Sequence, residues 1–76
     1  MIVQGDIVRV LADGKFEGQV VEVLKVNLKT HYTEYQLAVI RDGTLRPSWF
    51  SENEIELVQS EQSDVFNVYE AGFERD

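Results

Sequence analysis

The stretch that decides the fold is the N-terminal third of the chain, which begins GDIVRV at Gly5–Val10, turns at Asp13–Gly14 and resumes as EGQVVEV at Glu17–Val23. Both runs are rich in β-branched residues, which favour strands. The segment between them is short, polar and contains glycine, as a tight turn requires. The pattern is typical of two antiparallel strands joined by a turn.

Alternation of side chains gives these two strands their faces. In the first strand, expected over Gly5–Leu11, Val8 and Val10 lie on one face and the arginine between them on the other, so we expect the two valines to face the core. The second strand, over Glu17–Val26, does not alternate cleanly. A β-bulge or a sharp bend near Val20–Val21 would explain this, and small barrels use such bends to close.

The middle of the chain also favours strands. Asp42–Gly43 has the composition of a type I′ hairpin turn, in which both central residues take a positive φ. Pro47 has no N–H, so we expect its strand to lie at an edge or to be distorted there. Ser51 favours one capped helical turn, with 3₁₀ geometry as an option. The expected elements are therefore a loop at Asn27–Thr33, strands at Glu34–Arg41 and Thr44–Phe50, the helical turn at Ser51–Glu54 and a last strand at Ile55–Gln59.

Two stretches resemble known families. The first two strands resemble the KOW motif through Gly5-Asp6, Val8, Val10, Gly14, Gly18, Val20 and Val23. That motif occupies the first two strands of SH3-like barrels in some ribosomal proteins and transcription factors. The stretch WFSENEIEL at residues 49–57 is similar to the ending of SH3-like accessory proteins of photosystem and ferredoxin-linked complexes and of small prophage-encoded barrels. The resemblance implies an all-β fold, a five-stranded SH3-like small barrel over residues 1–59 with a short C-terminal extension.

The extension, residues 60–76, differs in composition from the barrel. It carries five acidic residues against one basic residue. Phe66, Tyr69 and Phe73 are spaced as one face of a helix, while a glycine at position 72 weakens that helix. A short helix, a disordered segment and an added strand all remain open, as do folding of the aromatic residues back onto the barrel and their docking into a groove of another protein.

Composition narrows the class of function. The chain has 76 residues, enough for one domain, and no cysteine, which excludes disulfides and thiolate metal sites and fits a cytoplasmic protein. No apolar run is long enough to span a membrane, and no charged leader precedes one, so we expect neither secretion nor a membrane partner. The net charge of −7 repels polyanions, which makes nucleic acid a disfavoured partner and favours a protein with a basic surface.

Aromatic residues are the first candidate site. We expect Tyr35, Trp49 and Phe50 to contact a protein partner, because exposed tyrosine and tryptophan give large contact areas with a polar atom. Trp49 and Phe50 alternate on one strand, so one of them faces the core. Phe16, Tyr35 and Trp49 could instead form a cage around a methylated cation.

Charged residues are the second candidate site. Glu52, Glu54 and Glu56 alternate near the last strand and would form a negative stripe that steers a basic partner. The chain's one histidine, His31, lies in a polar loop without the partners that catalysis or metal binding needs, so we interpret it as a surface residue. We expect no catalytic residue, no metal site and no cofactor.

The leading interpretation is a non-enzymatic interaction module that binds a protein partner, as an accessory subunit or as a regulator encoded by a phage or prophage. A KOW-like nucleic-acid or ribosome-associated protein is one alternative. An acidic inhibitor that mimics DNA is another. Phosphate contacts would have to come from four basic residues that could cluster, Lys25, Lys29, Arg41 and Arg46.

Overall fold

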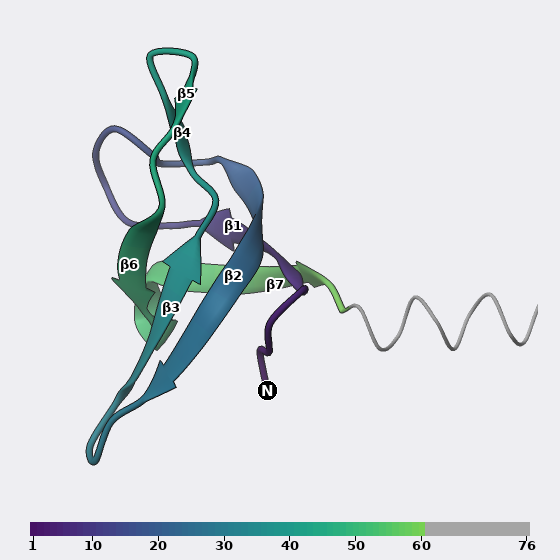
Figure 1. Cartoon of the computed structure of the whole chain (residues 1–76), viewed down its shortest axis with the longest axis vertical. Coiled ribbons are helices and arrows are strands. Elements are labelled where there is room, and N and C mark those ends of the chain that lie inside the picture. The colour runs from purple at the N-terminus through teal and green to yellow at the C-terminus, as the bar shows by residue number, and fades with distance from the viewer. Residues whose placement is uncertain (61–76) are drawn as a thin grey trace, which may run out of the picture.

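The computed structural model describes residues 1–60, and these form an all-β domain of antiparallel strands (Figure 1). The predictions made for Phe66, Tyr69 and Phe73, and for all of residues 61–76, lie outside the described residues. The elements are β1 (Ile7–Val10), β2 (Val20–Leu28), β3 (Thr33–Leu37), β4 (Ile40–Arg41), β5 (Thr44–Leu45), β6 (Ser48–Ser51), the 3₁₀ turn η1 (Glu52–Glu54) and β7 (Ile55–Gln59).

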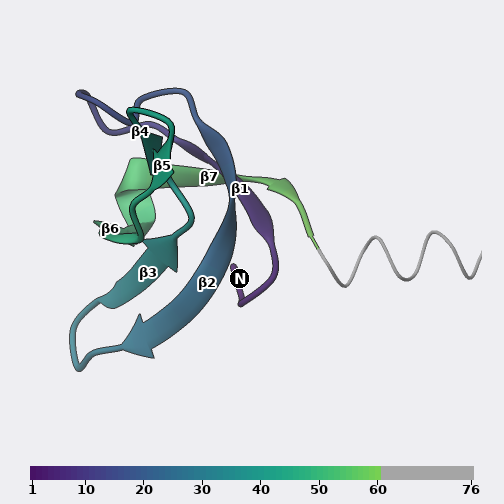
Figure 2. The ribbon, with the colours of Figure 1, turned by 45° about the horizontal axis from the view of Figure 1, so that its top comes forward.

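Five of the strands form one sheet in the order β6-β3-β2-β1-β7, and β4 and β5 form a separate hairpin that projects at the top of Figure 1. The sheet curls, so that β7 runs across the direction of β2 and β3 (Figure 2). Within residues 1–60, no ladder joins the edge strands β6 and β7, and the described sheet is therefore open. The all-β expectation is confirmed at this level.

The long strand β2 belongs to both halves of the sheet. Its first residues pair with β1, whereas its later residues pair with β3. The register shifts between Val23, opposite Leu37, and Lys25, opposite Gln36, which leaves Leu24 as the extra residue. The prediction of a bulge at Val20–Val21 is therefore wrong in position. The extra residue lies where β2 changes partners, because that is where the strand has to bend.

The two middle strands are interrupted. The strand expected at Glu34–Arg41 is split into β3 and β4, and the one expected at Thr44–Phe50 is split into β5 and β6. Pro47 lies in the second interruption, as its missing N–H led us to expect. At the tip of the hairpin, Asp42 has φ +54° and Gly43 has φ +74°, which confirms the type I′ turn.

Other boundaries move by a few residues. The first strand is shorter than Gly5–Leu11, and the loop expected at Asn27–Thr33 shrinks to residues 29–32, because β2 runs on to Leu28 and β3 begins at Thr33. The helical turn is a 3₁₀ turn with Ser51 as its N-cap, as predicted. Ser51 donates its backbone N–H to Glu54 Oε1 over 2.8 Å, which closes the turn.

The core lies on the concave side of the curled sheet. Val8 and Val10 are buried there as predicted, and the arginine between them faces solvent. Phe16, in the β1–β2 loop, packs against this cluster from outside. The buried apolar side chains come from both halves of the sheet and from the link between β3 and β4, and are Val8, Val10, Val23, Tyr35, Leu37, Val39, Phe50 and Ile55.

The buried carboxyl group of Asp6 attaches the N-terminal segment to the sheet. The side chain is 1% exposed, and Asp6 Oδ2 accepts a hydrogen bond of 2.9 Å from the backbone N–H of Val3. The backbone of Asp6 also donates to the Val3 carbonyl and accepts from Val23 N–H on β2. These bonds hold residues 1–4 against the ends of β2 and β3.

Candidate functional site

The three aromatic residues predicted to contact a partner lie on two faces of the sheet. Tyr35 pairs with Phe50 across β3 and β6, and the two side chains are 3% and 8% exposed. Trp49 pairs with Gln36 on the opposite face and is 45% exposed. Phe50 is thus the aromatic residue of β6 that faces the core. Of the three, Trp49 alone presents its ring to solvent.

The aromatic cage considered for a methylated cation does not form. Phe16 packs edge-on against Phe50, with ring centroids 6.1 Å apart and an interplanar angle of 78°. Tyr35 faces the core, as does Phe50, its partner across the two strands. Trp49 is the neighbour of Phe50 along β6 and therefore points to the opposite face. The three rings that a cage would need therefore do not converge on one point.

The three glutamates do not form a uniform stripe along one strand. Glu52 and Glu54 lie on η1, and only Glu56 lies on β7. Glu54 accepts the hydrogen bond from Ser51 N–H, and Glu56 forms an ion pair with Arg9 on β1. Glu52 is exposed. The three carboxylates thus lie near one another along the chain but differ in their surroundings.

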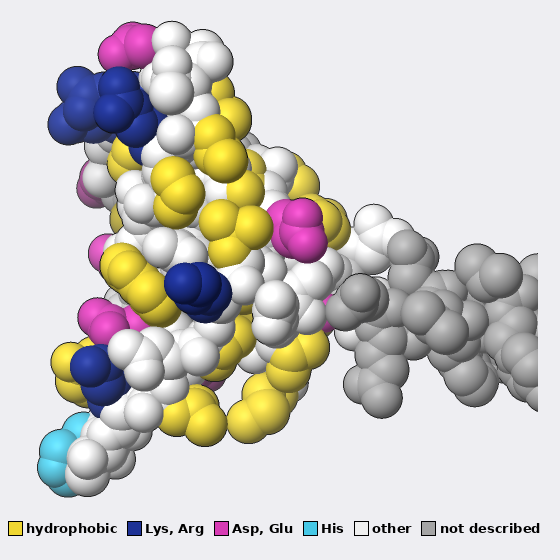
Figure 3. Space-filling model, viewed as in Figure 1, with side chains coloured by type: hydrophobic (Ala, Val, Ile, Leu, Met, Phe, Trp, Pro, Cys, Tyr) yellow, Lys and Arg dark blue, Asp and Glu magenta, His cyan; other side chains and the backbone are white. Residues whose placement is uncertain are grey.

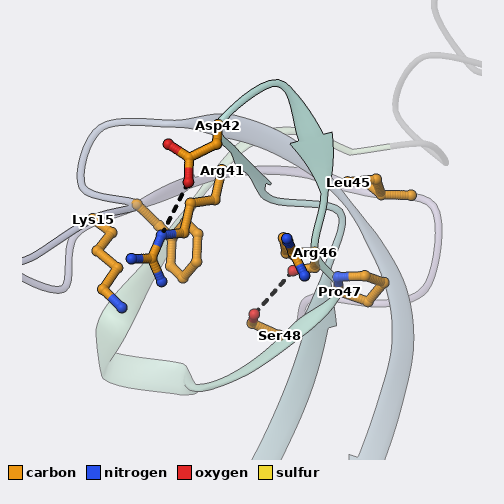
Figure 4. Close-up of a pocket in the computed structure, with 8 residues that line it drawn as sticks. Lys15, Arg41, Asp42, Leu45, Arg46, Pro47 and Ser48 are labelled. Carbon is orange, nitrogen blue, oxygen red and sulfur yellow. Dashed lines mark hydrogen bonds and ion pairs between the residues drawn. The ribbon is translucent and has the colours of Figure 1, made fainter.

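Three basic residues gather around a cavity beside the β4–β5 hairpin. Arg41 and Arg46 come from the hairpin, and Lys15 comes from the β1–β2 loop. Figure 3 shows the cluster of Lys and Arg at the hairpin end of the molecule, and Figure 4 shows the three side chains around the cavity. We call this cavity of about 660 Å³ the basic hollow, and its lining is Lys15, Phe16, Arg41, Asp42, Leu45, Arg46, Pro47 and Ser48.

This grouping differs from the expected one. Arg41 and Arg46 do lie together, but Lys25, on β2, and Lys29, in the loop after it, do not line the basic hollow. Lys15 was not among the residues expected to cluster. Its place in the turn between two predicted strands gave no sign of what the turn would approach, since the hairpin lies 25 or more residues further along the chain.

A side-chain amide connects the loop to the hairpin. Gln19 Nε2 donates to the carbonyl oxygen of Ile40 over 2.7 Å, and Ile40 N–H donates to Gln19 Oε1 over 2.8 Å. The amide of Gln19 thereby pairs with the backbone of β4 as a neighbouring strand would. Arg46 N–H donates to the carbonyl of Val39 and fixes the base of the hairpin. The two segments that carry the basic residues are thus held together by hydrogen bonds.

A second cavity, of about 400 Å³, lies at the end of β2 and β3. We call it the apolar hollow, and its lining is Met1, Ile2, Val3, Gln4, Val26, Leu28, Thr33, Tyr35 and Glu52. The pKa of the Tyr35 phenol is raised above its usual value of 10.0, first by burial and then by the negative charge of Glu52.

Three further findings bear on function. His31 is exposed, and no group of three or more His, Asp or Glu side chains within residues 1–60 is arranged to hold a metal ion. No helix in the same part of the chain is long and apolar enough to cross a membrane.

Comparison of the chain with protein-family models, with curated proteins and with solved structures finds no match.

Proposed function

We propose that this protein is a non-enzymatic interaction module that binds a protein partner at the outer face of β6, with Trp49 as the anchor. The observation that carries the proposal is the 45% exposure of a tryptophan on β6, an edge strand of the open sheet. Tryptophan is the residue type most enriched among those that dominate binding energy. An edge strand also offers backbone groups to which an extended peptide can add.

The neighbours of Trp49 suit such a contact. Gln36 and Lys25 follow it in one row across β6, β3 and β2, so an apolar ring, an amide and an ammonium group share this face. A partner strand along β6 would place one of its side chains beside Trp49 and polar groups beside the other two. Tyr35 and Phe50 support this surface from below, because they fill the core under the same strands.

Electrostatics favours a partner with a basic surface. The net charge of −7 attracts a cationic partner at long range and raises its association rate at low salt. Glu52 is exposed on the turn that follows β6 and would add to this attraction at short range. Glu54, which is hydrogen-bonded to Ser51, and Glu56, which is paired with Arg9, also contribute to the negative electrostatic potential of the protein. We place this interaction in the cytoplasm, in keeping with a chain that lacks cysteine.

We also infer that the fold is of the SH3-like type, with the KOW-like motif in β1 and β2. The support is the strand order β6-β3-β2-β1-β7, the bend in β2 where it changes partners, and the single 3₁₀ turn before the last strand. Solution NMR tests this inference: contacts between amide protons of β6 and β7 would indicate a closed barrel, and their absence would leave an open sheet.

The test of the binding site compares Trp49→Ala with Leu28→Ala. Leu28 is more exposed than Trp49 and lies at the far end of β2, so it serves as a matched control. The partner is first isolated by its binding to the wild-type protein, and its affinity for each variant is then measured. We expect Trp49→Ala to bind about 30-fold more weakly, the loss that corresponds to a hot spot of about 2 kcal/mol, and Leu28→Ala to bind normally.

The chain holds a single tryptophan, so its fluorescence reports directly on this surface. A blue shift of the Trp49 emission on adding the partner would support the proposal, and normal binding by a folded Trp49→Ala variant would refute it. If Leu28→Ala failed to bind the partner while Trp49→Ala still bound it, the binding site would be the apolar hollow. Displacement of the partner by duplex DNA would favour the DNA-mimic alternative.

A further inference from the structure

The basic hollow is lined by positive charges, although the molecule as a whole is negatively charged. The protein carries −7 overall, yet three of the six basic residues within residues 1–60 line this one cavity. They come from segments that are far apart in the sequence, the β1–β2 loop and the hairpin, and the Gln19 amide connects those segments. The fold thus brings three positive charges to one cavity, and an anion bound there would relieve their mutual repulsion.

The one carboxylate of the lining does not balance these charges. Asp42 Oδ2 is 3.8 Å from Arg41 Nε, and both side chains are largely exposed, so the pair is loose. By contrast, Arg9 forms a close ion pair with Glu56 on the neighbouring strand. In Figure 4 the guanidinium group of Arg41 and the ammonium group of Lys15 lie on one side of the cavity, and Arg46 lies across from them.

The residue types suit phosphate. A guanidinium group presents N–H donors in a planar fork that matches two phosphate oxygens, and the basic hollow contains two such groups. A lysine adds a third positive charge, and a phosphomonoester carries a charge of about −1.5 to −2 near neutral pH. The apolar side chains of Phe16, Leu45 and Pro47 complete the lining and give an organic group something to pack against.

Size and surroundings favour a small ligand over a nucleic acid chain. A volume of about 660 Å³ is that of a typical small-molecule site. Asp13 and Glu17 lie on the same loop as Lys15, and Asp42 lies at the tip of the hairpin. A polymer that left the cavity along the loop would meet Asp13 and Glu17, whereas a single phosphate would meet only Asp42, which lines the cavity itself.

We propose that the basic hollow binds the phosphate group of a small phosphorylated molecule, with Lys15, Arg41 and Arg46 as its ligands and the organic part against Phe16 and Pro47. This site is separate from the outer face of β6, and the proposal does not depend on the proposed function. Its failure would leave Trp49 unaffected, and the failure of Trp49 would leave the basic hollow unaffected.

The experiment titrates the full chain with a nucleoside monophosphate, a sugar phosphate, inorganic phosphate and an unphosphorylated nucleoside, and follows backbone amides by NMR. We expect saturable shifts with the phosphorylated compounds, centred on residues 15–16 and 41–48, and none with the nucleoside. The relative affinities of the nucleotide, the sugar phosphate and phosphate alone tell which organic group the cavity accepts. Absence of saturable binding by all three would overturn the proposal.

Two double variants provide the specificity test. Arg41→Gln with Arg46→Gln removes two positive charges from the basic hollow, and Lys25→Gln with Lys29→Gln removes two from elsewhere. We expect the first pair to weaken binding at least about tenfold and the second to leave it unchanged. Equal losses in both pairs would mean nonspecific attraction. Tighter binding of a single-stranded oligonucleotide than of the nucleoside monophosphate would replace the proposal with the nucleic-acid alternative.

Discussion

The two hollows lie at opposite ends of one small sheet and differ in how they are built. The basic hollow is lined by the β1–β2 loop and the β4–β5 hairpin, at the top of Figure 1. The apolar hollow is lined by the ends of β2 and β3 and by the N-terminal segment, at the bottom. A loop and a hairpin thus form the first hollow, whereas the ends of core strands and the N-terminal segment form the second.

Because of this difference, the residues of the apolar hollow contribute to stability, whereas the basic residues of the other hollow do not form part of the core. Tyr35 and Val26 line the apolar hollow and also belong to the core or pack against it, so changes there should affect folding. The cations of the basic hollow are exposed, and changes to them should leave the core intact. A small domain with little stability to lose can therefore vary its ligand chemistry at one end more freely than at the other.

The largest expected effect is at the apolar end. In Asp6→Ala the N–H of Val3 loses its side-chain partner, while the backbone bonds of residue 6 to Val3 and Val23 remain. A buried hydrogen bond to a charged group contributes about 2 kcal/mol, so the free energy of unfolding should fall by about that amount and the melting temperature by about 10 °C. Thermal unfolding followed by circular dichroism measures this.

Asp13→Ala is the control for Asp6→Ala, because Asp13 is an exposed carboxylate in the β1–β2 loop. We expect its melting temperature to stay within about 2 °C of the wild type, since exposed substitutions rarely change stability by more than 0.5 kcal/mol. If both aspartate variants unfolded at the same temperature, the hydrogen bond between the Asp6 side chain and Val3 would not stabilise the sheet.

The next effect is at the basic end and should be local. Gln19→Ala removes both of the exposed hydrogen bonds to Ile40. We therefore expect the free energy that holds the hairpin against the β1–β2 loop to fall by about 1 kcal/mol. Amide hydrogen exchange at Ile40 should become faster, while exchange at the core residues Val8 and Val23 should change little. Gln4→Ala, on the N-terminal segment, is the matched control. Equal protection of Ile40 in both variants would contradict the role of the Gln19 amide.

Local chemistry made some of this arrangement predictable. The Asp42–Gly43 turn follows from the positive φ that a type I′ turn needs, and the 3₁₀ turn follows from Ser51 as a cap. The burial of Val8 and Val10 follows from simple alternation. In each case the residues that determine the structure are within a few positions of one another, so no knowledge of the tertiary fold was required.

Tertiary contacts decided the rest. The bulge lies at Leu24 because β2 changes partners there, and which strands become partners is not encoded in β2 itself. The choice between Trp49 and Phe50 as the inward residue depends on the register of β6 against β3. Lys15 lines the same cavity as Arg46 only because a loop and a hairpin come together in space. The net charge of a sequence does not reveal the basic hollow, because its basic residues come together only in the tertiary structure.

The smallest expected effect concerns pH at the apolar end. Burial, and then the charge of Glu52, raise the pKa of the Tyr35 phenol above its usual value of 10.0, so the folded state holds this proton more tightly than the unfolded state. Below pH 10 the phenol is protonated in both states and stability is complete. Above that pH the unfolded chain ionises first, and stability falls as the pH rises through the folded-state pKa.

We therefore expect the free energy of unfolding of the wild type to decline above pH 10 more steeply than that of Tyr35→Phe, which has no phenol to ionise. Urea unfolding at a series of alkaline pH values measures the two slopes. Tyr32→Phe is the control, because Tyr32 is exposed and its loss should leave the decline unchanged. A decline of the same steepness in Tyr35→Phe would show that ionisation of the buried phenol is not linked to folding.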